Sequence, residues 1–154
     1  MPDDRVARPH STRIPVRWSD VDRRGHVNDS TYLDYAQEAR HRWFRDAMAA
    51  AGLPLPRVRS VTVDFLRPIL PGTAEVIVDT AITGLGTTSY SMQQTIRTSP
   101  TDIVAEVATV LVLMDTAGRH PTQVTDSARR MLMAYAAPEL TRGAGGEDAP
   151  GERD

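Results

Sequence analysis

The feature that most constrains this chain is a single change of hydrophobic period along its length. Within residues 32–51 the apolar residues recur at intervals of three and four, which places them in one stripe along a long helix. The stripe consists of Tyr32, Ala36, Ala39, Trp43 and Ala47. Three residues suited to capping precede it, namely Asn28, Asp29 and Ser30. Gly52 and Pro54 follow, so the helix is expected to end near Ala51.

Outside this helix the period falls to two, which predicts strands. One strand is expected before the helix, at 11–18, and four after it, at 58–67, 74–83, 88–98 and 103–114. A turn-forming segment follows each of these four strands, at 68–72, 84–86, 99–102 and 115–121. Each segment is short enough to link antiparallel neighbours. A short helix is expected at 126–136, with Thr125 or Asp126 as its cap and Pro138 as its end.

This order of elements predicts an α+β domain in which an antiparallel sheet curls over one long helix and buries its apolar stripe. We expect one domain at 11–138, because 154 residues suit one core and no linker divides the chain. Residues 1–10 are expected to form a flexible lead. The Gly-rich acidic tail at 139–154 has little to bury and is expected to be disordered.

The composition excludes several classes of function. The chain has no cysteine, which rules out a thiol nucleophile, a disulfide and a thiolate metal site. The formal net charge is -2, so the chain lacks the broad positive charge that nucleic-acid binding needs. Its arginines can still bind a small phosphorylated ligand. No apolar run approaches the ~20 residues of a membrane span, and the N-terminus has no apolar segment typical of a secretory signal. We therefore expect a cytoplasmic protein.

Chemically useful side chains gather between the first strand and the long helix. They are Asp20, Asp22, His26, Asn28 and Asp29. The cluster ends at a helix N-terminus, where free N–H groups and the helix dipole favour negative charge. A carboxylate next to such donors suits acyl transfer, which needs a group that attacks a carbonyl or activates water, and donors for the oxygen that becomes negative.

These residues resemble the hotdog-fold thioesterases of the 4-hydroxybenzoyl-CoA thioesterase type. The segment DVDRRG at 20–25 matches the Asp-x-Asp-x-x-Gly loop that leads into the central helix of that family. The continuation HVN at 26–28, then Tyr32 and EAR at 38–40, looks like its acyl-CoA and acyl-carrier branches. The resemblance spans residues 14–132 and includes FLRPI at 65–69 before a Pro-Gly turn. It implies a five-stranded antiparallel sheet wrapped around one long helix.

The resemblance also implies roles for individual residues. Asp22 takes the place of the family's nucleophile or general base, and an ordinary Asp is ionised at neutral pH. The backbone N–H of Asp29 takes the place of the donor that polarises the thioester carbonyl, although relatives usually have Asn there. His26 and Asn28 match positions that help to hold water or the carboxylate. The implied substrate is an acyl-CoA or acyl-carrier-protein thioester, with CoA as part of the substrate and no separate cofactor. The implied assembly is a homodimer or homotetramer with sites between subunits.

Each of these residues also has a structural interpretation. Asp20 is expected to be a turn residue, His26 can bond to a neighbouring backbone, and Asn28 is an ordinary cap type. Glu38 stands where another thioesterase branch keeps a catalytic acid, but Arg42 one turn later makes a solvated ion pair the preferred interpretation.

Two other functions stay open at this point. One is a noncatalytic module that binds acyl-CoA or acyl carriers, because fold alone does not imply activity. The other is a hotdog dehydratase or hydratase, for which His26 would supply the base. No metal site is predicted, because the four histidines are not spaced along the sequence as metal ligands usually are.

Overall fold

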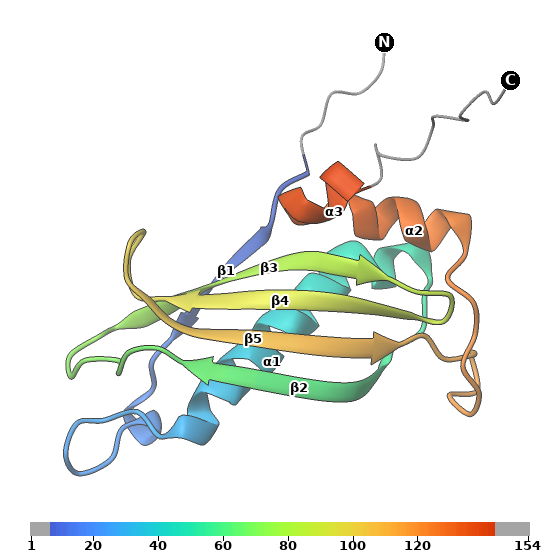
Figure 1. The fold of residues 1–154 in the computed structure, drawn as a ribbon. Coiled ribbons are helices and arrows are strands. Elements are labelled where there is room, and N and C mark those ends of the chain that lie inside the picture. The colour runs from blue at the N-terminus through green and yellow to red at the C-terminus, as the bar shows by residue number, and fades with distance from the viewer. Residues whose placement is uncertain (1–6, 144–154) are drawn as a thin grey trace, which may run out of the picture.

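The structure, a computed structural model, describes residues 7–143. Five strands form one sheet with the long helix packed on one face (Figure 1). The strands are β1 (His10–Pro15), β2 (Arg57–Phe65), β3 (Glu75–Leu85), β4 (Ser89–Arg97) and β5 (Ile103–Val112). The helices are α1 (Asp29–Ala47), α2 (Asp126–Met133) and α3 (Pro138–Gly143), with 3-10 turns η1 (Trp18–Asp20) and η2 (Ala49–Ala51). The predicted α+β architecture, with one long helix and an antiparallel sheet, is confirmed.

The order of strands in the sheet is β1-β3-β4-β5-β2, and every neighbouring pair is antiparallel. One expectation is therefore wrong: the turn at 68–72 joins β2 to β3, which are separated by β4 and β5. β2 instead crosses to the far edge and pairs with β5. Local turn chemistry could not reveal this pairing, because β2 and β5 are distant in sequence.

The apolar stripe of α1 forms the centre of the core, as predicted. Its first half packs with buried residues of β1, β3 and β5, and its second half packs with β3, β4 and α2. Trp43 and Phe44 are both buried, at 0% and 7% exposure. The strand alternation is also confirmed in β3, where Val76 and Val78 are buried and Ile77 and Asp79 on the other face are half-buried.

Several element ends differ from the sequence expectation. β1 ends at Pro15, because the chain turns into η1, where Asp20 accepts a hydrogen bond from the Arg17 backbone N–H at 2.8 Å. α2 ends at Met133, because the following residues pair with the edge of β3: the Ala137 N–H donates to the Ile82 carbonyl at 2.7 Å.

Of the two predictions made for the ends of α2, the one for Pro138 is wrong and the one for the cap is confirmed. Pro138 begins α3 rather than ending α2, since the first helical position tolerates the missing N–H of proline. Thr125 is the cap of α2, accepting from the Ala128 N–H at 3.1 Å. Residues 1–6 of the predicted lead and 144–154 of the predicted tail lie outside the described residues. Within 7–143, no helix is both long and apolar enough to cross a membrane.

β2 differs from the other strands in its exposure. β4 alternates between buried and half-buried residues, whereas eight of the nine residues of β2 are exposed. The register with β5 shows which side faces the helix: Val58, Val61 and Phe65 stand opposite Leu111, Thr109 and Ala105. These three β5 residues are buried, so β2 presents these apolar residues to the inner side of the sheet, where they stay exposed and only Val63 packs against the core.

Candidate active site

A tight turn between β1 and α1 carries Asp22. The Asp22 N–H donates to the His26 carbonyl at 2.8 Å, and the Gly25 N–H donates to the Asp22 carbonyl at 3.0 Å. Gly25 has a φ of +79°, a left-handed conformation that costs other residues about 1–2 kcal/mol. A Cβ at this position would lie 3.1 Å from Cγ of Pro71, so the turn also packs closely against the β2–β3 loop. The motif thus needs its glycine for both conformation and space.

The carboxylate of Asp22 is held by one oxygen. Oδ1 accepts hydrogen bonds from the backbone N–H groups of Arg24 at 2.8 Å and His26 at 3.0 Å. The His26 N–H is the main reason that the pKa of Asp22 lies below its ordinary value, and it outweighs the opposing effect of partial burial. Oδ2 makes no hydrogen bond with any residue in 7–143. An ionised, oriented carboxylate therefore keeps one oxygen free.

The start of α1 supplies the donors expected beside this carboxylate. Asn28 is the N-cap by backbone position, but its side chain makes no capping bond. Its carbonyl accepts from the Thr31 N–H at 2.9 Å. The N–H groups of Asp29 and Ser30 have no acceptor within the described part of the chain, as expected for a first helical turn. The Asp29 side chain is exposed and favourably placed in the field of the helix dipole.

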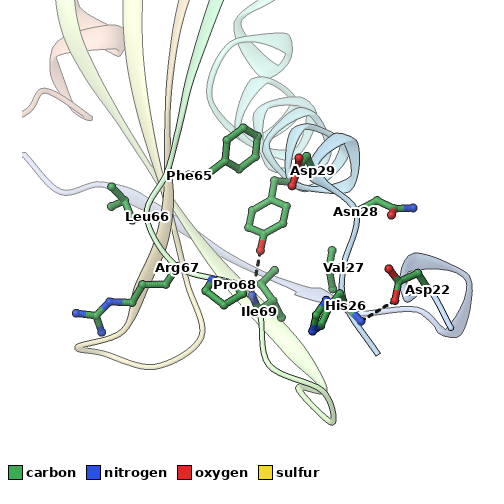
Figure 2. Close-up of a pocket in the computed structure, with 11 residues that line it drawn as sticks. Asp22, His26, Val27, Asn28, Asp29, Phe65, Leu66, Arg67, Pro68 and Ile69 are labelled. Carbon is green, nitrogen blue, oxygen red and sulfur yellow. Dashed lines mark hydrogen bonds between the residues drawn. The ribbon is translucent and has the colours of Figure 1, made fainter. Parts of the chain in front are cut away.

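A cleft of about 470 Å³ joins these groups to the loop that follows β2. Asp22, His26, Asn28 and Asp29 all line it, and residues 65–69 form the opposite wall (Figure 2). Tyr32 ties the two walls together, because its hydroxyl accepts the Ile69 N–H at 2.9 Å and its ring meets Phe65 edge-on with centroids 5.4 Å apart. The cleft is therefore lined both by Asp22, whose Oδ2 is free of hydrogen bonds, and by Asp29, whose backbone N–H has no acceptor within the described residues.

Comparison with known proteins decides the family. The model of the thioesterase-like superfamily matches residues 16–132, most of the chain. The chain belongs to this superfamily. It is a thioester hydrolase by family, and the resemblance noted in its sequence is confirmed.

Solved structures agree with this assignment. A thioesterase from Thermus thermophilus, complexed with coenzyme A and Zn, is 33% identical with a TM-score of 0.69, over 81% of this chain and 92% of that one. A candidate thioesterase from Pseudomonas aeruginosa is 32% identical with a TM-score of 0.69, over 79% and 95% of the two chains. A predicted thioesterase from Bacillus stearothermophilus, 23% identical with a TM-score of 0.73 over 84% and 97%, shares the fold. The curated proteins gave no significant match.

Asp20 lies outside the cleft of this thioesterase and anchors the loop that carries Asp22. It is 4% exposed, and its Oδ2 accepts from the Arg17 backbone N–H at 2.8 Å and from the Tyr35 hydroxyl at 2.9 Å. Burial by itself would raise the pKa of Asp20, but these bonds and the Arg17 guanidinium hold that pKa below its ordinary value. The predicted turn residue is therefore a buried connection between the loop and α1.

Two more predicted side chains of the thioesterase can be placed. Glu38 pairs with Arg42 at 3.0 Å on an exposed part of α1, as expected, and does not line the cleft. The side chain of Asn28 projects away from Phe65 and Ile69, so only its position at the rim relates it to the cavity (Figure 2). Within 7–143, no group of three or more His, Cys, Asp or Glu side chains is placed to hold a metal ion.

Sequence reasoning missed the wall formed by residues 65–69. FLRPI was noted as a family signal, but nothing in it is reactive and it lies far from Asp22 in the chain. In the structure this wall is held to α1 by Tyr32, whose hydroxyl accepts the Ile69 N–H at 2.9 Å. Cavity walls made of ordinary apolar side chains carry no local signature.

Proposed function

We propose that this thioesterase hydrolyses acyl-CoA thioesters, or the equivalent acyl-carrier thioesters, with Asp22 as the catalytic carboxylate. The observation that carries the proposal is that Asp22, which keeps one carboxylate oxygen free of hydrogen bonds, and Asp29, which keeps an unpaired backbone N–H, line the same cleft. The coenzyme A bound by the Thermus thermophilus relative supports CoA as the carrier. A CoA substrate would place the reaction in the cytoplasm.

In this proposal the thioester carbonyl oxygen points at the start of α1. The Asp29 N–H donates to that oxygen as it becomes negative, and the helix dipole adds to the stabilisation. The Asp29 carboxylate has to stay turned away, because a second negative charge near the oxyanion would oppose its formation. His26 and Asn28 line the rim, where they would help to position water or the substrate.

Two routes lead from this arrangement to products. In the first, the free Asp22 oxygen attacks the carbonyl carbon, the C–S bond breaks, CoA leaves as a thiolate, and water then hydrolyses the acyl-aspartate anhydride. In the second, Asp22 accepts a proton from a water molecule whose oxygen attacks the carbonyl carbon. Both routes release one free acid and one thiol. Trapping of an acyl group on Asp22 would select the first.

The exposed edge of β2 supports an assembly in which two chains pair there. An unpaired edge with apolar residues on its inner face invites a second strand, and pairing about a two-fold axis would extend the sheet across both chains. The cleft beside Phe65 would then lie at the contact between subunits. We propose a homodimer or homotetramer. Sedimentation of a fully active monomer would contradict this assembly.

A thiol-release assay over aliphatic and aromatic acyl-CoAs tests the activity. Asp22→Asn is expected to lower kcat/KM by about 10²- to 10⁴-fold, because it removes the charge and leaves the shape. Asp115→Asn is the matched control: Asp115 is a half-buried turn residue, and its Oδ1 accepts the Arg119 N–H at 2.9 Å ahead of a left-handed Gly118. Asp115 does not line the cleft, so its variant should keep full activity.

Two results would contradict the proposal. Failure of the wild type to release thiol from any acyl-CoA or acyl-carrier substrate removes the substrate class. Equal activity of wild type and Asp22→Asn removes Asp22 from the mechanism, and equal losses in the Asp22 and Asp115 variants would show an effect on folding alone.

A further inference from the structure

An uncovered apolar strip connects the cleft to a second cavity. The strip consists of Val58, Val61 and Phe65 on the inner face of β2, which are 40%, 42% and 50% exposed, whereas Val63 between them is half-buried against the core. Phe65 lines the cleft at one end, and Val58 lines a smaller cavity at the other. From Asp29 to Arg40, which also lines the smaller cavity, the rise along α1 is about 16 Å. An extended chain bound at the cleft could therefore follow β2 to this cavity.

The second cavity has a volume of about 50 Å³ and an unusual lining. Phe44 and Leu111 contribute apolar surface, but the polar side chains of Arg40, His41, Trp43 and Tyr90 border it as well. The rings of Trp43 and Tyr90 contact each other, with centroids 6.0 Å apart. Four side chains that can form hydrogen bonds thus border the cavity; His41 is exposed, and the donors Arg40, Trp43 and Tyr90 are half-buried or buried.

None of these three donors has a partner within residues 7–143. The Trp43 Nε1 and the Tyr90 hydroxyl are buried without a hydrogen bond, in side chains that are 0% and 1% exposed. Arg40 is half-buried and forms no ion pair or hydrogen bond with the described residues. A buried polar group without a partner costs about 1–3 kcal/mol, so a cluster of them is not expected in a purely structural core.

The chemistry of the donors defines what would satisfy them. The Trp43 indole and the Arg40 guanidinium can only donate. Burial raises the pKa of the Tyr90 hydroxyl, so Tyr90 stays protonated and can donate as well. Burial also lowers the pKa of Arg40, which is the expected effect on a cation without a counter-ion. The missing group is therefore an acceptor, and a negatively charged acceptor would balance Arg40.

We propose that the preferred acyl groups carry a carboxylate at the end remote from the thioester, and that Tyr90, Trp43 and Arg40 bind this carboxylate. The inference rests on the proposed function, because it needs the thioester carbonyl at Asp29 and the acyl chain along β2. At roughly 1.3 Å per C–C bond, a span of about 16 Å corresponds to about twelve bonds. The substrates are then CoA monothioesters of dicarboxylic acids of about that length.

The rival explanation is one buried water molecule. A cavity of 50 Å³ can hold one, and a water could accept from the three donors. In that case an acyl chain with a plain methyl end would bind at least as well as one with a carboxylate. The two explanations therefore predict different selectivity between acyl chains that end in a carboxylate and acyl chains that end in a methyl group.

The test compares pairs of CoA thioesters of equal length, from eight to sixteen carbons, with and without the distal carboxylate. We expect the wild type to favour the carboxylate by about tenfold or more in kcat/KM near the matching length. Tyr90→Phe and Arg40→Met should each reduce that preference about tenfold, while hydrolysis of the plain thioester stays within about twofold. Tyr135→Phe is the matched control, because Tyr135 also contacts the Trp43 ring, at 6.0 Å, but does not line the cavity.

A second readout does not depend on turnover. Dodecanedioic acid, a reaction product in this scheme, should raise the Tm of the wild type more than dodecanoic acid does, and Tyr90→Phe should abolish the difference. The Tm of each variant without ligand confirms that it folds.

The outcomes separate this inference from the proposed function. Absence of any acyl-CoA hydrolysis defeats both. Asp22-dependent hydrolysis with no preference for the carboxylate, or with a preference that survives Tyr90→Phe, overturns this inference alone and leaves the water explanation.

Discussion

The bond between Tyr35 and Asp20 allows a sharp test of how the loop that carries Asp22 is held. Tyr35→Phe removes one hydroxyl that donates to the Asp20 Oδ2 at 2.9 Å, in a residue that is 2% exposed. A hydrogen bond to a charged group contributes about 1.5–3 kcal/mol. Asp20 keeps its bonds from Arg17, so the lower part of that range applies. We expect a loss of about 2 kcal/mol, which lowers the Tm by roughly 8 °C in a chain of this length.

The effect should depend on pH in a defined direction. The pKa of Asp20 is lower in the folded state than in the unfolded chain, and the Tyr35 hydroxyl contributes to that lowering. Stability from such a group is present above the unfolded pKa of about 3.9 and is lost as the pH falls through the folded pKa. The difference in unfolding free energy between wild type and Tyr35→Phe should therefore be constant from pH 8 to 5 and shrink below about pH 4.

Urea unfolding at pH 7, 5 and 3.5 measures this difference. Tyr32→Phe is the control, because the Tyr32 hydroxyl is also buried but accepts from an uncharged group, the Ile69 N–H. Its cost, about 1–2 kcal/mol, should not change with pH. In an Asp20→Asn background, Tyr35→Phe should cost much less than in wild type. The anchoring role of Asp20 would be refuted if Tyr35→Phe lowered the unfolding free energy as much in the Asp20→Asn protein as in wild type. It would also be refuted if this loss in wild type did not depend on pH.

Three further predictions concern the loop that carries Asp22 and the cap of α2. Gly25→Ala should lower the unfolding free energy measured in urea by about 2 kcal/mol and lower kcat/KM, because the new Cβ meets Pro71. Gly118→Ala, whose Cβ would have nothing within 4 Å, should lower the unfolding free energy by only about 1 kcal/mol and leave activity unchanged. Equal losses in the two variants would exclude a destabilising contact with Pro71. The kcat/KM of the wild type should stay level from pH 8 to 5 and fall below about pH 4, because the pKa of Asp22 is lowered; an acid limb near pH 6 would point to another group. Thr125→Ala should destabilise the protein by about 1 kcal/mol in the same unfolding assay, since it removes the cap of α2, and an unchanged midpoint would show that water replaces the cap.

The order of elements and the candidate site could be predicted from sequence to a useful degree because both are local. The stripe of α1 and the alternation of the strands reflect a repeat of a few residues. The cleft residues from Asp22 to Asp29 fall within one loop and one helix start, so the chain brings them together whatever the rest of the fold does. The roles assigned to these residues come from the family resemblance and stay predictions.

Element ends were predicted less well where a tertiary contact set them. α2 stops at Met133 because the backbone at Ala137 bonds to Ile82 of β3, a contact that no local signal encodes. Asp20 and Asp22 look alike in sequence, two positions apart. In the structure one faces the buried hydroxyl of Tyr35 and the other lines the cleft.

The sequence by itself determined the elements, the loop that carries Asp22 and the donors at the start of α1, since neighbours along a chain stay neighbours in space. Only the tertiary structure decided that β2 lies at the edge beside β5, that residues 65–69 close the cleft, and that Arg40 and Tyr90 line a second cavity. The physical reason is that pairing between distant strands depends on the packing of the whole core, and many pairings fit the same alternation.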